Sequence, residues 1–371
     1  MDNRTLENLA LRDDFATIIR ERIPLLDVRS PCEFAEGAFP AAVNLPLLDD
    51  EQRHRVGIAY KQQGQKAAIN LGQRLVSGDL RLRRIEAWID FVIDHPDALL
   101  YCFRGGLRSK TAQQWIYEHA GLTVARLAGG YKALRRFLLE VLEPHNIAAS
   151  PTILAGRTGT GKTLLLGRLN NSIDLEGLAH HRGSAFGAYL SPQPSQIDFE
   201  NALAAALLQH AARGCRYLVV EDEGSYIGAR HLPHPLAAFF KRESMVLLES
   251  GMQDRVSLTW REYVVEAQRE WCGFLGDQEG LQGWYDQTIK RLKRIGKRLG
   301  GERLQRVQKA LDVAHMQQLE TGVAHGHRKW VEILLREYYD PMYDYQMKKS
   351  GRRVEFCGKF TEVEDYLLNL G

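Results

Sequence analysis

The feature that most constrains the fold is an eight-residue motif in the second half of the chain. It has the pattern G-x-x-x-x-G-K-[ST] and consists of Gly156, Arg157, Thr158, Gly159, Thr160, Gly161, Lys162 and Thr163. An apolar run at 151–155 precedes it and a helix-like start at 164–169 follows it, which is the strand–loop–helix context of a P-loop. The glycines direct backbone N–H groups at a phosphate chain, Lys162 adds a positive charge, and the Thr163 hydroxyl can bind Mg²⁺. The motif recognises phosphates and does not specify a nucleobase.

Further strand-like runs follow the motif at 172–175, 217–220 and 245–249, with an Ala/Leu-rich helix predicted over 201–212. Strands that alternate with helices indicate a parallel sheet in an α/β domain of the P-loop NTPase type. Three acids, Glu221, Asp222 and Glu223, end one apolar strand and resemble the Walker B position. One of them is expected to hold Mg²⁺ through water or to polarise a nucleophile; a solvated acidic turn is the alternative.

The C-terminal region is predicted to be helical and basic. Apolar residues recur there at helical intervals, and Gly300-Gly301 should break or bend the run. One face should therefore pack, while the other presents cations that suit a nucleic-acid backbone, although basic faces are also common without any polyanion. The candidate nucleic-acid-binding cations are Lys290, Arg291, Lys293, Arg294, Lys297 and Arg298. Aromatic residues further on either stack on bases or, as with Trp330, Leu334 and Tyr338, form the inward stripe of a helix.

The first half of the chain contains a candidate nucleophile, Cys102. A strand-like run at 97–101 leads into the loop Cys102-Phe103-Arg104-Gly105-Gly106-Leu107-Arg108, and a helix is expected to start near Ser109. Glycines let successive N–H groups face an anion, and Arg104 and Arg108 favour a thiolate over a thiol. The alternative is a buried structural cysteine. Cys32 is the weaker candidate, because it lacks flanking glycines and has acidic neighbours.

Composition limits the remaining classes of protein. A length of 371 residues favours two domains, and the helix end and linker near Glu143-Pro144-His145-Asn146 place them at 1–145 and 146–371. The net charge of +3 neither requires nor excludes a nucleic-acid partner. Five scattered cysteines without a C-x-x-C pair argue against a disulfide framework or a metal site and favour the reducing cytoplasm. The polar N-terminus, 1–14, and the lack of an apolar run of about 18 residues predict a protein that is neither secreted nor membrane-bound.

The first 140 residues resemble a rhodanese domain. The resemblance depends on the strings 27–29 (Asp-Val-Arg), 33–34 (Glu-Phe), 44–46 (Asn-Leu-Pro) and 127–131 (Leu-Ala-Gly-Gly-Tyr), and on Cys102 with Arg108. Rhodaneses carry sulfur as a persulfide on the loop cysteine, so the resemblance implies chalcogen transfer through Cys102. Five residues separate Cys102 from Arg108, however, where common sulfurtransferase rhodaneses have four. The longer loop is also that of tyrosine phosphatases, and it suits a phosphate-sized anion or selenium.

Taken together, the two halves resemble the tRNA 2-selenouridine synthase family across essentially the whole chain. Supporting strings are 56–64 (VGIAYKQQG), 175–184 (LEGLAHHRGS) and 338–343 (YYDPMY). The resemblance implies a bacterial enzyme that replaces the sulfur of wobble 2-thiouridine in tRNA with selenium from selenophosphate. It also implies a geranyl transfer from geranyl diphosphate, which makes an S-geranyl intermediate. Cys102 would accept or position selenium, Arg104 and Arg108 would hold its phosphate, and the P-loop would hold the diphosphate.

No tightly bound cofactor is expected, and the P-loop motif allows Mg²⁺ at Thr163 without showing that it is required. The resemblance also implies a selenophosphate-supplying enzyme as a partner. The sequence carries no signal for the oligomeric state. Two other functions fit the motifs. One is a bifunctional phosphatase/NTPase with a general acid at Asp27 or among the acids at 221–223. The other is a non-catalytic anion sensor that regulates a partner.

Overall fold

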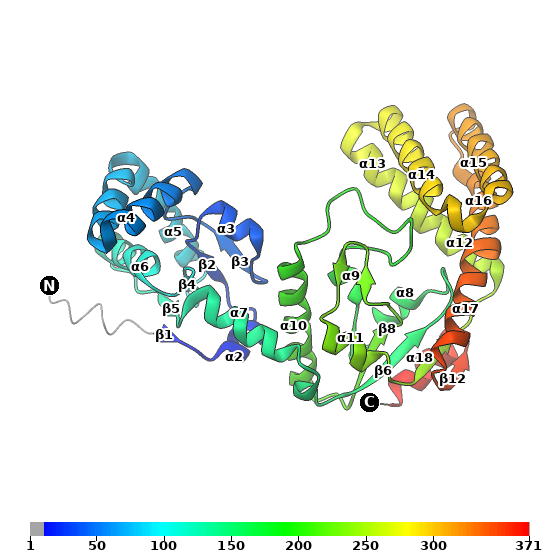
Figure 1. Cartoon of the computed structure of the whole chain (residues 1–371), viewed down its shortest axis with the longest axis horizontal. Helices are drawn as coiled ribbons and strands as arrows, with labels where there is room; N and C mark the ends of the chain where they lie inside the picture. The colour runs from blue at the N-terminus through cyan, green and yellow to red at the C-terminus, as the bar shows by residue number, and fades with distance from the viewer. Residues whose placement is uncertain (1–10, 371) are drawn as a thin grey trace. The chain divides into compact units, whose positions relative to one another are not determined.

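The computed structural model describes residues 11–370, so most of the polar N-terminal segment noted above lies outside the described residues. The chain divides into two compact units, each described here by itself (Figure 1). The first unit extends to Asn146 and also includes Ser195–Ala212, while the second contains Ile147–Pro194 and the chain from Arg213 onward.

The first unit contains a sheet of five parallel strands in the order β1-β5-β4-β2-β3. The strands are β1 (Leu11–Arg12), β2 (Leu25–Asp27), β3 (Ala42–Asn44), β4 (Leu99–Tyr101) and β5 (Ala125–Leu127). The central strands β2 and β4 are fully buried and pair Leu26 with Leu100, which is why their sequences are apolar rather than alternating. The carboxyl end of β4 leads directly into the loop that carries Cys102.

Helices surround this sheet. They are α2 (Phe15–Arg20), α3 (Pro31–Glu36), α4 (Asp50–Leu75), α5 (Gly78–Asp94), α6 (Leu107–Ala120), α7 (Gly130–Val141) and α10 (Gln196–Ala212), with a short 3₁₀ turn at Pro144–Asn146. Trp88 of α5 and Trp115 of α6 stack with ring centroids 6.2 Å apart in a core with Leu26 and Leu100. Helix α4 is interrupted at Gly64, whose φ is 82°.

Helix α10 corrects the predicted domain assignment. The helix expected over 201–212 was assigned to the second domain, but α10 belongs to the first unit, where it contacts α7 and α2. Asn201 donates a hydrogen bond to the carbonyl of Ala38, and Arg135 of α7 pairs with Glu200. Its apolar residues lie on several sides of the helix, so the sequence carried no indication of which sheet it would join.

The second unit is built on another parallel sheet, in the order β12-β11-β6-β8-β7. Its strands are β6 (Ser150–Ala155), β7 (Ser172–Ile173), β8 (Tyr217–Glu221), β11 (Met245–Leu248) and β12 (Val354–Gly358); β9 (Tyr226–Ile227) and β10 (Arg230–His231) form a separate hairpin. Strand β6 is central and ends at the P-loop, where open parallel sheets place ligands.

Short helices accompany this sheet, and a second group of helices lies between β11 and β12 in the chain (Figure 1). The short ones are α8 (Lys162–Leu166), α9 (Leu175–Leu178), α11 (His234–Phe240) and α18 (Phe360–Leu368). The others are α12 (Met252–Trp260), α13 (Ala267–Leu275), α14 (Asp277–Leu299), α15 (Gly301–Thr321), α16 (Arg328–Leu334) and α17 (Asp340–Ser350), with η2 (Arg261–Glu266), η3 (Ala324–His327) and η4 (Leu335–Tyr339) between them. Gly300, with φ 88°, separates α14 from α15, as the sequence predicted.

The structure confirms the predicted fold class, α/β with parallel sheets and a helical C-terminal region. Among residues 11–370, no helix combines the length and the apolarity needed to cross a membrane.

Candidate functional site

The first candidate site is the Cys102 loop, residues 102–108. Cys102 is only 3% exposed and its Sγ lies 3.3 Å from the hydroxyl oxygen of Ser109, which in turn donates to the carbonyl of Gly106. Gly105 has a φ of 63°, a conformation that glycine adopts without strain. The loop therefore places the sulfur below a tight glycine turn, where backbone N–H groups can surround an anion.

The start of α7 holds this loop in place. The N–H of Tyr131 donates to the carbonyl of Cys102 at 2.9 Å, and the N–H of Lys132 donates to the carbonyl of Phe103 at 3.0 Å. A Cβ atom on Gly130 would lie 2.2 Å from the carbonyl oxygen of Cys102, so only glycine allows this approach. Arg126 adds a hydrogen bond to the carbonyl of Gly105. The Gly129-Gly130 pair therefore allows the start of α7 to pack closely against the cysteine loop.

The two arginines predicted to bind an anion have different environments. Arg108 is largely buried and donates to both carboxylate oxygens of Glu33, at 2.5 and 3.1 Å. Burial would raise the pKa of Glu33, but the hydrogen bond and charge of Arg108 outweigh it and leave that pKa below its usual value. Arg104 is exposed, with its guanidinium 5.9 Å from the ring centre of Phe103. Arg104 is consequently the more accessible cation for an incoming anion.

Asp27 was the candidate general acid of a phosphatase. It is fully buried and accepts hydrogen bonds from Arg29, whose Nε lies 2.8 Å from Oδ2 and whose guanidinium also sits over the ring of Tyr131. Asp27 is therefore held in an internal ion pair and does not line the cavity at Cys102.

The second candidate site is the P-loop, residues 156–163. Gly159 and Gly161 have φ values of 80° and 92°. A Cβ on Gly159 would lie 2.4 Å from the hydroxyl oxygen of Thr259, and one on Gly156 would lie 2.8 Å from the carbonyl oxygen of Leu248. The Nζ of Lys162 donates to the carbonyl of Gly156 at 2.8 Å and so lies across the loop. The glycines at these positions therefore allow the close backbone packing on which the phosphate cradle depends.

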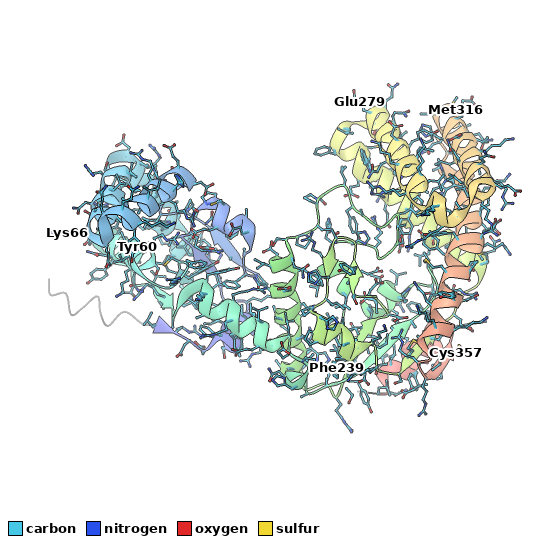
Figure 2. The ribbon with its side chains drawn as sticks, in the orientation of Figure 1. Tyr60, Lys66, Phe239, Glu279, Met316 and Cys357 are labelled. Atoms are coloured by element: carbon cyan, nitrogen blue, oxygen red, sulfur yellow. The ribbon has the colours of Figure 1, made fainter. Side chains whose placement is uncertain are left out.

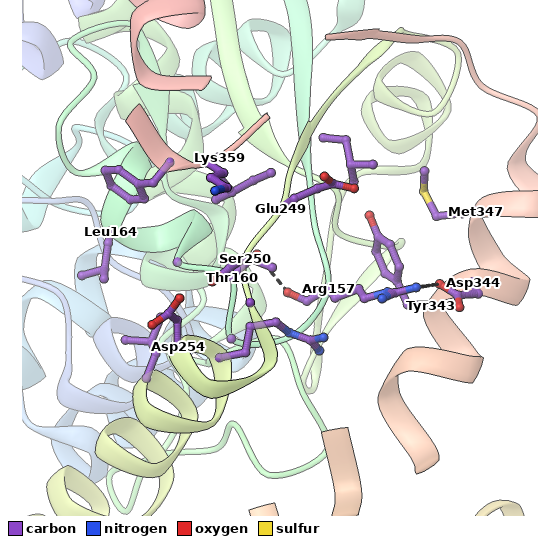
Figure 3. Close-up of a pocket in the computed structure, with 18 residues that line it drawn as sticks. Arg157, Thr160, Leu164, Glu249, Ser250, Asp254, Tyr343, Asp344, Met347 and Lys359 are labelled. Carbon is purple, nitrogen blue, oxygen red and sulfur yellow. Dashed lines mark hydrogen bonds and ion pairs between the residues drawn. The ribbon is translucent and has the colours of Figure 1, made fainter. Parts of the chain in front are cut away.

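Helices from later in the chain brace this loop. Arg255 of α12 donates to the carbonyl of Thr158 at 2.9 Å and forms a bidentate ion pair with Asp340 of α17. Arg157, expected among the phosphate-binding residues, donates to Asp344, also of α17, at 2.6 Å (Figure 3). The Arg157 side chain therefore connects the P-loop to α17, while its backbone forms part of the loop.

The three predicted Walker B acids point to three different partners. Glu221 is buried and accepts the N–H of Leu175, and burial followed by the charge of Asp174 raises its pKa well above the usual value. Asp222 pairs with Arg352. Glu223 lies beside Glu176, and burial together with Glu176 raises the pKa of Glu223 well above the usual value. Glu223 is the acid that belongs to the P-loop site.

Glu176 is a site residue that the sequence analysis did not single out. It lies 3.5 Å from the Thr163 hydroxyl, which donates to it, and it also interacts with the charge of Lys162. Burial raises its pKa despite these contacts. In residues 11–370, no group of three or more His, Cys, Asp or Glu side chains could hold a metal ion by itself. Two carboxylates and a hydroxyl are nonetheless hard oxygen ligands of the kind Mg²⁺ accepts when a diphosphate supplies the others.

Comparison with known proteins identifies the family. The sequence profile of the tRNA 2-selenouridine synthase AAA domain matches residues 149–370. A curated tRNA 2-selenouridine synthase of Sulfurovum sp. (strain NBC37-1) is 47% identical, covering 98% of this chain and 99% of the relative. That of Hydrogenovibrio crunogenus (strain DSM 25203 / XCL-2) is 50% identical, covering 96% and 98%. The chain belongs to the tRNA 2-selenouridine synthase family.

The predicted basic face of this family member is largely accessible. Lys290, Lys293, Arg294, Lys297 and Arg298 on α14 are exposed, while Leu292, Ile295 and Leu299 pack into the core, as the helical spacing predicted. Arg291 differs: it is partly buried and donates to the carbonyls of Phe186 and Ala188 at 2.8 and 2.7 Å. The Arg291 side chain therefore anchors the loop around 186–188.

Of the two alternatives for the aromatic residues near the C-terminus, base stacking or an inward helix stripe, the structure shows the inward stripe for three residues. Trp330, Leu334 and Tyr338 are buried in the core of the second unit. Tyr345 on α17 is exposed, so its ring is accessible for stacking.

Proposed function

We propose that this protein is a tRNA-modifying transferase that converts wobble 2-thiouridine to 2-selenouridine with selenophosphate, through an S-geranyl intermediate made from geranyl diphosphate. The observation that carries the proposal is the near full-length identity to curated relatives named tRNA 2-selenouridine synthase. The two anion-binding loops support it, because each of the two donors presents a phosphate or diphosphate group to the protein.

In the first step, the sulfur of 2-thiouridine attacks C1 of the geranyl group. A C–S bond forms, the C–O bond to the diphosphate breaks, and the diphosphate leaves with the electron pair while the uracil ring loses its N3 proton. The P-loop N–H groups and Lys162 would bind the departing diphosphate. Thr163, Glu176 and Glu223 would hold Mg²⁺, which when bound neutralises charge on the leaving group.

A cavity of about 980 Å³ beside the P-loop offers room for the geranyl chain of the donor (Figure 3). Its wall next to the loop is apolar: Leu258 and Phe360 are both 3.7 Å from the position that a Cβ on Gly161 would take, and Leu164, the residue that follows the P-loop, is exposed. A diphosphate held by the loop thus has an apolar surface directly beside it. We call this space the P-loop cavity.

In the second step, selenium replaces the alkylated sulfur. Alkylation converts a poor leaving group into geranylthiol, so that the selenium of selenophosphate can add at C2. A C–Se bond forms, the C–S bond breaks and geranylthiol leaves with a proton; water then cleaves the Se–P bond, which releases phosphate and leaves 2-selenouridine. Cys102 would position the selenium, and Arg104 with the loop N–H groups would hold the phosphate of selenophosphate. The exposed cations of α14 would bind the tRNA backbone. A selenophosphate-supplying enzyme is the expected partner.

One incubation tests this proposal against its alternatives. The full-length protein is mixed with 2-thiouridine tRNA and geranyl diphosphate, then with selenophosphate, and the nucleosides are analysed by mass spectrometry. The proposal expects a geranyl mass gain followed by conversion to 2-selenouridine. Phosphate release from an aryl phosphate without any nucleoside change would favour a phosphatase, and ligand binding without turnover would favour a sensor. Either result would contradict the proposed function.

A further inference from the structure

The cavity at Cys102 is much larger than an anion requires. It measures about 1010 Å³ and is lined by Cys102, Arg104 and Arg108 at one end. A tetrahedral anion of five heavy atoms displaces on the order of 150 Å³, at about 30 Å³ for each atom the size of water. Most of this space, here called the Cys102 cavity, is therefore left for another part of a substrate.

The walls of the Cys102 cavity indicate what that part is. They are mainly apolar and include Leu47 and Leu48 after β3, Val56, Ile58 and Ile69 of α4, and Trp115 of α6. Ile58 is 41% exposed and Ile69 37% exposed, although both are large and apolar, because they face this opening. Small-molecule sites are typically cavities of 300–1,000 Å³ with mainly hydrophobic walls. This space therefore suits a hydrocarbon group.

Exposed cations line the Cys102 cavity alongside Glu33 and Glu36. Arg53, Lys61 and Arg104 line it and are exposed, and Tyr60, labelled in Figure 2, lines it from the same helix as Lys61. If an RNA carries a hydrocarbon group on one base, its phosphates can pair with these cations while the hydrocarbon group packs against the apolar wall.

We propose that the Cys102 cavity binds the geranyl chain of S-geranyl-2-thiouridine while the Cys102 loop acts on the neighbouring carbon. This inference rests on the proposed function and adds the location of the chain in its second step. The chain is bonded to the sulfur that leaves C2, so it must lie within a few bonds of the selenium carrier. The apolar wall next to Cys102 meets that requirement in the same unit of the protein.

The proposal has a consequence for the order of the two steps. Burial of a hydrocarbon chain tightens binding by about fourfold for each methylene removed from water. The site would therefore select the geranylated nucleoside over the 2-thiouridine from which it is made. Selenium transfer would then follow geranylation, because the site binds the geranylated nucleoside more tightly than the unalkylated one.

Equilibrium binding of two RNAs to the full-length protein tests this inference. Both are anticodon stem-loops with an alkylated 2-thiouridine at the wobble position, one S-methyl and the other S-geranyl. We expect the S-geranyl RNA to bind at least about 100-fold more tightly, since partial burial of nine additional carbons suffices for that ratio. Equal affinities would overturn the proposal.

Substitutions locate the chain. Ile69→Asp, and independently Ile58→Asp, places a charge on the apolar wall and should lower the S-geranyl to S-methyl affinity ratio at least tenfold. Ile93→Asp is the matched control, because Ile93 is 59% exposed on α5 of the same unit and does not line the cavity. The assignment would be overturned if the S-geranyl to S-methyl affinity ratio were unchanged in both cavity variants. It would also be overturned if that ratio fell in Leu258→Asp at the P-loop cavity instead.

The outcome can be separated from that of the proposed function. Geranylation of unalkylated 2-thiouridine tRNA by the wild-type protein is measured in parallel with geranyl diphosphate. Absence of geranylation would contradict the proposed function, whereas the affinity ratio of the prepared RNAs reports on the Cys102 cavity alone. Thermal unfolding of each Asp variant confirms that a lowered ratio is measured on folded protein.

Discussion

Replacement of Gly130 by alanine should disable the Cys102 loop while leaving the P-loop site intact. The added Cβ would lie 2.2 Å from the carbonyl oxygen of Cys102 and 2.3 Å from the amide nitrogen of Gly105, so the loop or the start of α7 must move. Movement weakens the hydrogen bonds from Tyr131 and Lys132, each worth about 1 kcal/mol. The φ of 60° adds roughly 1–2 kcal/mol for a residue with a side chain. The total cost is therefore about 3–4 kcal/mol.

Gly121→Ala is the matched control for this substitution. Gly121 has a similar φ of 68°, but a Cβ there would have no atom within 4 Å, so only the cost of roughly 1–2 kcal/mol for the backbone conformation applies. Denaturant unfolding measures both costs, and nucleoside mass spectrometry measures selenium incorporation from S-geranyl tRNA. Since misplacement by about 1 Å can lower a rate about 100-fold, Gly130→Ala should lose that much activity and Gly121→Ala should not. Equal rates in the two variants would refute the role assigned to the Gly130 contact.

Three further predictions concern the second unit. Lys162→Ala should weaken binding of geranyl diphosphate about 10- to 100-fold, as expected for a lost charge-assisted contact, and unchanged affinity in calorimetry would argue against a diphosphate at the P-loop. The second prediction neutralises four exposed cations of α14, which are Lys293, Arg294, Lys297 and Arg298. This change should weaken tRNA binding and reduce the slope of log K against log [salt] by about 3. An unaltered slope would show that this face does not contact RNA. Glu223→Gln should stabilise the ligand-free protein increasingly as pH rises above about 4.3, because a folded-state pKa that is raised by burial and Glu176 costs stability once the carboxyl ionises. Thermal unfolding at pH 5 and pH 8 measures this, and no gain at pH 8 would contradict it.

Local sequence was sufficient to predict the two loops. In each of them, a buried strand, a run of glycines and a following helix are contiguous in the chain, so spacing alone indicates the geometry. The interruption at Gly300 and the inward stripe of α14 were predictable for the same reason, because helical periodicity is a local signal.

Partners distant in sequence could not be predicted in this way. Arg108 pairs with Glu33, 75 residues away, and this pairing leaves Arg104 as the accessible cation. Glu176 approaches Thr163 only because β7 and β8 place α9 beside the P-loop. Glu33 and Glu176 both lie in strings that carry the family resemblance, 33–34 and 175–184. Neither string indicates which residue the glutamate contacts.

Strand β12 was not predicted, and the unit that helix α10 joins could not be, because their sequences do not have the usual patterns. Strand β12 is a mostly exposed edge strand with a glutamate and a cysteine, so it lacks an apolar run that would predict a strand. Helix α10 is rich in alanine and leucine on several sides, which predicts burial but does not name the surface that buries it.

In the proposed function, two phosphate-binding loops carry out two successive steps on one uridine. A time course of both modified nucleosides tests this on 2-thiouridine tRNA, with geranyl diphosphate and selenophosphate present, for wild type and Cys102→Ser. We expect S-geranyl-2-thiouridine to rise and then fall as 2-selenouridine forms in wild type, and to accumulate without selenium incorporation in the variant. Equal loss of both products in Cys102→Ser, or 2-selenouridine formed at the same rate without geranyl diphosphate, would contradict it.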